Sequence, residues 1–347
     1  MAFYDGLFDT LGLRDWCDAG QETGPMSMAQ LLAQSSGATG AAEPATPLLQ
    51  TPFPSLDTLH EACPAIAQTR DMTTGVENAF LAIKNPLKVI LDPITQPLSW
   101  LLDGSLAFFH AVPWFILIPA LLMLTYYATR RWGVTAFVAV SFLFLAFIDH
   151  YSYAVETLSI IFVCTMISVA LGVPLGILMA RSDTMQKISI PILDMLQTLP
   201  TFVYLIPLIF LFSVTESKLY GIAIILYAIV PVIRLTDLGI RLVDRDVIEA
   251  ADAFGMTDRQ KLFGVQIPLA LPNIMAGINQ TIMMSLAMVV IASLVSAPGL
   301  GVLVLRGIRN LELGVGLVSG FGIVLLAVLL DRTTKAALGR INASYKT

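Results

Sequence analysis

Charged residues are scarce in this chain of 347 residues: Asp, Glu, Lys and Arg make up 13% of it, whereas 56% is hydrophobic. A soluble globular domain carries roughly 25% charged residues. Cysteine is also scarce: the chain has three, with no Cys-x-x-Cys pair. Three such residues cannot build a disulfide scaffold or a zinc cluster. The net charge of -5 gives no general attraction to nucleic acid. These shortages exclude a soluble enzyme and leave an integral membrane protein.

Long apolar runs are what the sequence has in place of charge. A helix that crosses the hydrocarbon core needs about 20 mostly apolar residues, because its backbone must satisfy its own hydrogen bonds. By this criterion we predict an all-α integral membrane protein with about seven spans, six or eight being open alternatives. The spans lie near residues 105–128, 132–148, 154–180, 189–213, 217–236, 274–297 and 313–331.

The distribution of Lys and Arg predicts the orientation of these spans, because cytoplasmic loops are enriched in basic residues. With the N-terminus outside, 13 basic residues fall on the cytoplasmic side: Arg130, Arg131, Arg181, Lys187, Arg234, Arg241, Arg245, Arg259, Lys261, Arg332, Lys335, Arg340 and Lys346. The outer loops after the tail hold only three, Lys218, Arg306 and Arg309. This bias predicts a multi-pass protein with its C-terminus in the cytoplasm.

The part of the chain before the first span differs from the rest. Residues 1–103 contain 12 acidic and 4 basic residues. We predict that residues 1–74 form an acidic, partly disordered tail outside the cytoplasm, with a Pro-rich linker at 36–48. Cys17 and Cys63 would both face an oxidising compartment there, and their pairing is left open.

Residues 75–103 form a separate apolar stretch, interrupted by Pro86, Pro93 and Pro97. We expect these prolines to divide it into short helices. The preferred interpretation is an amphipathic segment that lies in the membrane interface; a plain connector before the first span is the alternative. A transmembrane domain would then occupy residues 104–340.

One long polar segment interrupts the transmembrane domain, at residues 240–272. Asp246 with Glu249 predicts a capping box that opens a first helix, and Gly255 would cap its C-terminus. Thr257 with Gln260 would open a second helix, and Pro268 would stop or kink the chain before the next span. The product is a short helix–turn–helix that projects into the cytoplasm, unless the segment only joins two spans.

This segment resembles the EAA motif of importer-type ABC transporter permeases, whose pattern is Glu-Ala-Ala, three residues, Gly, nine residues and Ile-x-Leu-Pro. Glu249, Ala250, Ala251 and Gly255 occupy the matching positions, followed after nine residues by Val265-Gln266-Ile267-Pro268. The Val and Ile in the last part are conservative departures. The resemblance implies that Glu249, Ala250, Ala251, Gly255 and Pro268 couple this chain to an ATP-hydrolysing subunit.

Three further stretches resemble the glycine betaine, proline betaine and choline permeases of osmoprotectant uptake. They are LDMLQTLPTFVYLIPLIFLF (193–212), NQTIMMSLAMVVIASLV (279–295) and GLGVLVLRGIRNLELG (299–314). The resemblance implies a type I ABC importer permease in the bacterial inner membrane, which moves a quaternary amine by alternating access. Its implied partners are two ATP-binding subunits, a soluble substrate-binding protein and a second copy of the chain.

The chain has no Walker A sequence, since GLGVLVLRG lacks the Gly-Lys-Ser/Thr ending. We therefore expect no catalytic activity and no cofactor in this chain, with ATP and Mg bound by the partner ATPase.

Polar, aromatic and helix-kinking residues in the fourth and sixth spans are candidates for lining a translocation path. They are Gln197, Thr198, Pro200, Phe202 and Tyr204, with Asn279 and Gln280. A permanently charged trimethylammonium group can pass such surfaces by cation–π contact and water. The alternative is that these residues only pack between helices.

Two other functions stay open. One is an ABC permease for another small solute, such as an amino acid or an anion. The other is a secondary transporter or a membrane scaffold that needs no ATPase. Secondary transporters commonly show internal repeats and paired broken helices, and we find no clear repeat in this sequence.

Overall fold

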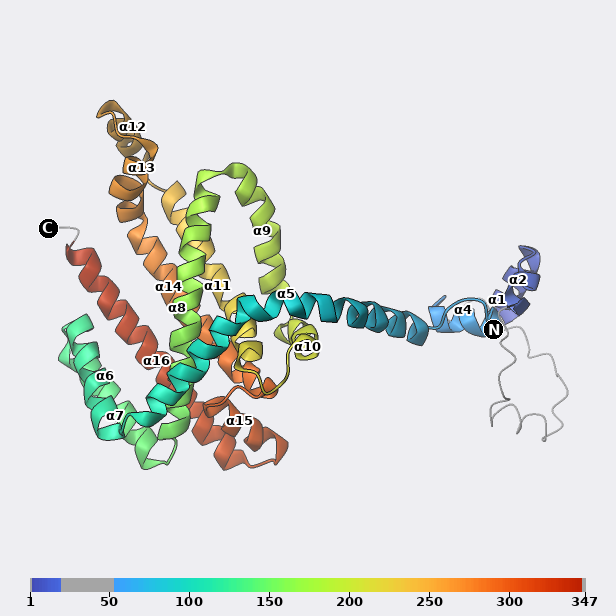
Figure 1. The fold of residues 1–347 in the computed structure, drawn as a ribbon, viewed down its shortest axis with the longest axis horizontal. Helices are drawn as coiled ribbons and strands as arrows, with labels where there is room; N and C mark the ends of the chain where they lie inside the picture. The colour runs from blue at the N-terminus through green and yellow to red at the C-terminus, as the bar shows by residue number, and fades with distance from the viewer. Residues whose placement is uncertain (1, 20–52, 345–347) are drawn as a thin grey trace. The chain divides into compact units, whose positions relative to one another are not determined.

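The computed structural model describes residues 2–19 and 53–344, and within these ranges the regular structure is helical (Figure 1). The helices are α1 (Ala2–Thr10), α2 (Arg14–Ala19), α4 (Leu56–Ala62), α5 (Thr69–Ala111), α6 (Trp114–Thr129), α7 (Trp132–Phe147), α8 (Tyr151–Arg181), α9 (Asp183–Thr198), α10 (Thr201–Leu211), α11 (Ser217–Arg241), α12 (Arg245–Ala253), α13 (Asp258–Lys261), the π-helix η2 (Leu262–Gln266), α14 (Ile267–Ala292), the 3-10 helix η3 (Ser293–Val295), α15 (Leu300–Arg309) and α16 (Leu313–Ser344). The predicted all-α class is confirmed. Contacts divide the chain into two units, Met1–Leu87 and Lys88–Thr347.

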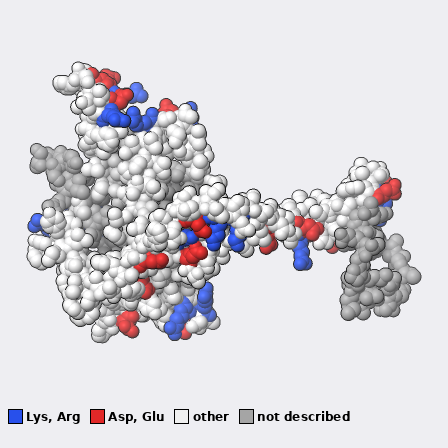
Figure 2. Space-filling view, viewed as in Figure 1, with Lys and Arg blue, Asp and Glu red and all other residues white. Residues whose placement is uncertain are grey.

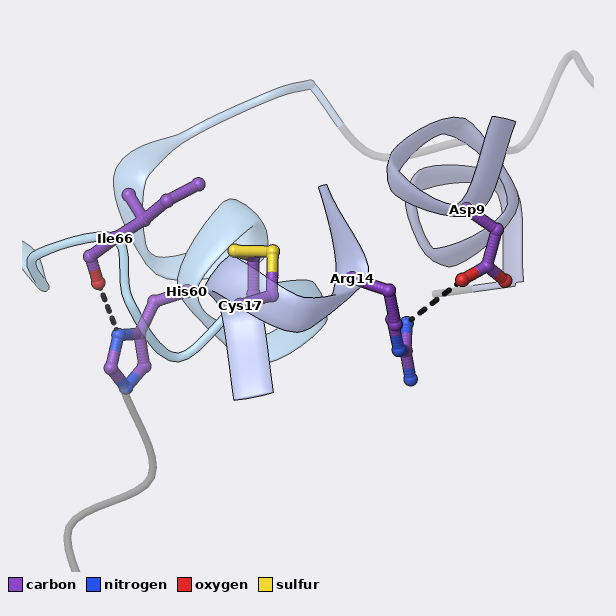
Figure 3. The surroundings of a disulfide bond; sticks show 6 residues. Asp9, Arg14, Cys17, His60 and Ile66 are labelled. Atoms are coloured by element: carbon purple, nitrogen blue, oxygen red, sulfur yellow. Dashed lines mark hydrogen bonds and ion pairs between the residues drawn. A yellow bond between two sulfur atoms is a disulfide. The ribbon is translucent and has the colours of Figure 1, made fainter. Parts of the chain in front are cut away.

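A disulfide bond holds the first unit together. Cys17 of α2 is bonded to Cys63, the residue after α4, with 4.7 Å between their Cα atoms (Figure 3). Both cysteines are fully buried, in a small core with Tyr4, Phe8 and Ala62. The pairing that the sequence left open is therefore present. The predicted linker at residues 36–48 lies outside the described residues.

The prediction that prolines divide residues 75–103 into short helices is wrong. α5 is one continuous helix of 43 residues that contains all three prolines. Pro86, Pro93 and Pro97 lie seven and four residues apart, so they share one face of the helix, and all three are exposed. The missing backbone donors therefore fall on the same side, where a long helix can adjust to them without ending.

Four helical segments among the described residues are long and apolar enough to cross a membrane. They are α8, α11, the run Asp258–Val295 and Leu313–Ala337 of α16. There are also two bent pairs, α5 with α6 and α9 with α10, and the number becomes six if each pair is counted as one span. α7 is apolar but has only 16 residues. Each of the seven predicted ranges thus overlaps an apolar helix, and the count of seven stays a prediction.

The predicted first span, residues 105–128, is not one helix in the structure. α5 ends at Ala111, α6 begins at Trp114, and their axes differ in direction by 111°. Pro113 precedes α6 with extended backbone angles of φ -61° and ψ 147°. A proline ring disfavours helical geometry in the residue before it, but its missing donor is tolerated where a new helix starts. Pro113 therefore sets the bend.

α11 is the central helix of the second unit, with α8 and α14 packed against it. Glycines allow these close approaches. A Cβ added to Gly176 of α8 would lie 2.7 Å from the carbonyl oxygen of Ile233, and one added to Gly277 of α14 would lie 3.0 Å from Cα of Val232. Helices in membranes associate through such small residues, because lipid gives no hydrophobic drive for one helix to bind another.

Candidate functional site

The segment with the EAA pattern folds as a helical elbow, made of α12, α13 and η2, which connects the central helix α11 to α14 (Figure 1). The N-cap of the first helix is Asp244, two residues earlier than the predicted Asp246. The Asp244 carboxylate accepts a hydrogen bond of 3.0 Å from the backbone N–H of Asp246. The predicted capping box of Asp246 with Glu249 is therefore wrong. Asp244 already occupies the cap, so Asp246 lies inside the first turn, where its charge favours the helix dipole.

The predicted C-terminal cap of this helix is confirmed. Gly255 has a left-handed φ of +74°. Its N–H donates to the carbonyl of Asp252 at 2.9 Å, and the N–H of Met256 donates to the carbonyl of Ala251 at 3.1 Å. This pair of bonds is the Schellman motif, which glycine favours because it has no Cβ to clash in the left-handed region. Gly255 thus fixes the turn between α12 and α13.

The predicted capping box of the second helix is also confirmed. The N–H of Thr257 donates to Oε1 of Gln260 at 2.8 Å, and the N–H of Gln260 donates to the Thr257 hydroxyl at 3.4 Å. Lys261 then joins the two helices, with its Nζ 2.6 Å from Asp252 and 3.3 Å from Asp258. The elbow is therefore held by local hydrogen bonds and by one bridging cation.

Of the two predicted effects of Pro268, a stop or a kink, the stop is wrong. Pro268 lies in the first turn of α14, which follows η2 without a break. In η2 the N–H of Ile267 donates to the carbonyl of Leu262, five residues earlier. This wider π-type turn accommodates the ring and the missing donor of Pro268. The chain from Asp258 to Val295 is consequently helical throughout.

The elbow exposes apolar surface that the EAA pattern did not single out. Glu249, Ala250 and Gly255 are exposed, Ala251 is buried and Pro268 is half-buried. Beside them, Phe254 is 87% and Phe263 66% exposed, with Val247 and Met256 also accessible. Figure 2 shows charged atoms around this tip and a largely uncharged surface below it in the same view. Exposed aromatic residues rimmed by charge are typical of a protein-binding surface.

The candidate path residues of the fourth span gather at a broken helix. Gln197 and Thr198 end α9, Pro200 precedes α10, and the two helices meet at 94°. Phe202 and Tyr204 lie in the first turn of α10; the ring of Phe202 is exposed, and the Tyr204 hydroxyl lies 3.6 Å from Sδ of Met288 on α14. Polar, aromatic and apolar groups thus meet at this break.

The structure does not bring Asn279 to the same place. Its side-chain amide donates to Oδ1 of Asp331 on α16 at 3.2 Å, and Asp331 also pairs with Lys335. Gln280, the next residue of α14, is exposed. The seven candidate residues therefore divide between the α9–α10 break and α14, where Asn279 contacts α16 and Gln280 is exposed. Within the described ranges, no group of three or more His, Cys, Asp or Glu side chains could hold a metal ion.

Comparison with known proteins gives one family match and several similar proteins. The family described as the binding-protein-dependent transport system inner membrane component matches residues 172–342. The chain is 38% identical over 300 residues to the glycine betaine/proline betaine transport system permease protein ProW of Escherichia coli (strain K12), covering 86% of this chain and 83% of that protein. It is 40% identical over 270 residues to the glycine betaine/carnitine transport permease protein GbuB of Listeria monocytogenes serotype 1/2a (strain 10403S), covering 77% and 91%. Among solved structures, an inward-facing form of the MetNI methionine ABC transporter aligns with a TM-score of 0.49 at 20% identity, over 55% of this chain and 95% of that chain.

Proposed function

The chain belongs to the family of binding-protein-dependent ABC importer permeases, and from this premise we propose that it is the membrane subunit of an importer for glycine betaine and proline betaine. The observation that carries the proposal is the 38% identity to a permease named for these two solutes, over 86% of this chain. Choline shares the trimethylammonium group of glycine betaine and is the related substrate that we would test beside these two solutes.

We propose that the elbow is the contact with the ATP-hydrolysing subunits. Its exposed Glu249, Ala250 and Gly255 match the coupling motif, and Phe254 offers an apolar anchor. Two ATPases that close on ATP would press on two elbows, one from each copy of a permease homodimer. The movement would shift the spans between inward-open and outward-open states. Mg and ATP would be bound by the ATPases.

The proposed orientation places the N-terminal unit outside the cell membrane and the elbow in the cytoplasm. The Cys17–Cys63 bond supports it, because disulfides persist in oxidising compartments. The basic residues support it too, since 13 of them fall on the elbow side of the spans against three in the outer loops. A soluble binding protein would deliver the solute to the outer face.

We propose that the α9–α10 break lines part of the translocation path. Phe202 and Tyr204 supply aromatic faces, and Gln197 and Thr198 supply polar groups beside them. Such a surface can pass a trimethylammonium cation by cation–π contact without holding it firmly. High affinity would reside in the binding protein, so the purified permease should bind glycine betaine weakly.

The test is uptake of labelled glycine betaine into vesicles that contain this chain, its ATPase and its binding protein. Uptake should require ATP, and unlabelled proline betaine should compete whereas a neutral amino acid should not. Competition by an amino acid but not by proline betaine would favour the alternative, an ABC permease for another small solute. Uptake without ATP hydrolysis, or tight betaine binding by the permease alone, would overturn the proposal.

A further inference from the structure

Three polar links join α9 to α11. Each link connects one residue of α9 with one of α11: Asp183 Oδ1 with Arg241 Nη1 at 2.7 Å, Gln186 Nε2 with Asp237 Oδ2 at 2.7 Å, and the Asp194 carboxylate with the Arg234 guanidinium. We call these six residues the polar seam. Charged groups are rare in a membrane body, and where they occur they commonly have a function.

Helical geometry puts each half of the seam on one face. The α9 residues lie at positions 183, 186 and 194, and the α11 residues at 234, 237 and 241. These spacings are near whole numbers of helical turns. The first residue of α9 meets the last of α11, so the two helices run in opposite directions along the seam.

The seam also reaches α8 through Arg241. The Arg241 guanidinium binds the buried Asp237 at 3.0 Å and the carbonyl oxygen of Met179 at 2.9 Å. The end of α11 is therefore tied both to the hairpin between α8 and α9 and to its own preceding turn. On the other side, Gly239 lets α11 pack closely on Asn273 of α14.

The apolar contacts between α9 and the helices around it are few. Leu193 is buried in the cluster around Ile229 and Ile233. Much of the rest of α9 is accessible, since Ile188, Ile192 and Met195 are all more than half exposed. The seam is thus a principal attachment between α9 and α11.

The two ends of the seam lie at functionally distinct places. Arg241 is three residues before Asp244, which caps the first helix of the elbow. Asp194 is four residues before Thr198, where α9 ends at the 94° break. The seam therefore spans the distance between the elbow and the candidate path.

We propose that the polar seam transmits movement of the elbow to the α9–α10 break, with Arg234 and Arg241 as positioning residues. The pairs stay closed through the cycle, so that α9 moves with α11 as one body. This inference rests on the proposed function, in which an ATPase pushes the elbow.

The experiment measures solute moved per ATP hydrolysed by the reconstituted complex in vesicles. Asp194→Asn and Arg234→Gln should each lower this ratio about tenfold, a common size for coupling between sites, while ATP hydrolysis and assembly with the ATPase persist. The exchange variant Asp194→Arg with Arg234→Asp should recover most of the ratio. Arg306→Gln, which removes the ion pair with Glu312 in the α15–α16 turn, is the matched control and should leave the ratio unchanged.

Should the Asp194 variants fail to assemble, Asp183→Asn tests the other end, because Asp183 is highly exposed and is not part of the core. Asp183→Asn should lower the amount of solute moved per ATP about threefold. Equal loss of uptake and hydrolysis, or an exchange variant no better than the single variants, would overturn the seam as a transmission element. Absence of betaine uptake by the wild-type complex would instead count against the proposed substrate, and the two failures are distinguishable.

Discussion

Lys261 and Asp252 lie on different helices of the elbow, and their Nζ and Oδ1 atoms are 2.6 Å apart. The contact joins α13 to α12 across the turn that Gly255 forms. Lys261 is half-buried, and its Nζ also lies 3.3 Å from Asp258. A single ammonium group thus holds both sides of the surface on which an ATPase would press.

Lys261→Met should loosen the elbow without unfolding the protein. The methionine keeps most of the apolar stem but cannot bind either carboxylate, and partly exposed ion pairs contribute little to stability. We expect ATP-driven uptake to fall about threefold, with normal amounts of protein in the membrane. Lys88→Met, which removes the weaker contact to Glu216 at 3.9 Å, is the control. Equal uptake by the Lys261 and Lys88 variants would contradict the role of the bridge.

Gly255→Ala should weaken binding of the ATPase. An alanine at φ +74° is strained by about 1–2 kcal/mol, so the turn between α12 and α13 would shift. A loss of about 1.4 kcal/mol corresponds to tenfold weaker binding, measured by titrating purified permease with the ATPase. Gly264→Ala in η2 is the matched control, because an added Cβ meets no atom within 4 Å at either glycine, whereas of the two only Gly255 has a left-handed φ. Wild-type affinity of the Gly255 variant would count against a role for the turn.

Phe254→Asp should abolish most of the ATPase affinity, because a large aromatic side chain at 87% exposure can fill a pocket in the partner. Aromatic residues at the centre of an interface commonly contribute about 2 kcal/mol or more. Leu311→Asp is the control: Leu311 is 89% exposed but lies in the α15–α16 turn, away from the elbow. If both variants bind the ATPase equally well, Phe254 is not an anchor.

Thiol labelling should report the side of the membrane on which the first unit lies. In intact cells, a membrane-impermeant thiol reagent should label Cys17 and Cys63 only after reduction, since both are in the disulfide. The buried Cys164 should stay unlabelled. Cys17→Ser with Cys63→Ser should lose labelling and digest faster with protease, because removal of such a bond costs about 2–5 kcal/mol in a small domain. Labelling that requires a permeabilised membrane would place the unit in the cytoplasm.

Local hydrogen-bond chemistry made the elbow partly predictable. The capping box of Thr257 with Gln260 and the left-handed Gly255 involve atoms at most a few residues apart, and both are found as expected. The first cap was misplaced by two residues, because Asp244 and Asp246 are equally suitable residue types. Only the path of the backbone decided between them.

Proline positions were less informative. Pro113 and Pro200 each precede a new helix, whereas Pro93 lies within α5 and Pro268 in the first turn of α14. A proline removes one donor wherever it stands. Whether the helix continues depends on the surrounding backbone, such as the π-type turn before Pro268, which the sequence does not reveal.

The sequence by itself determined the membrane class, the approximate apolar ranges and the EAA pattern from Glu249 to Pro268, because these depend on composition and short-range spacing. Only the tertiary structure decided that Cys17 meets Cys63, that Asn279 faces Asp331, and that Asp194 meets Arg234. Such partners are distant in the chain. Their meeting depends on how whole helices pack, and helix packing is set by the shape of many side chains together.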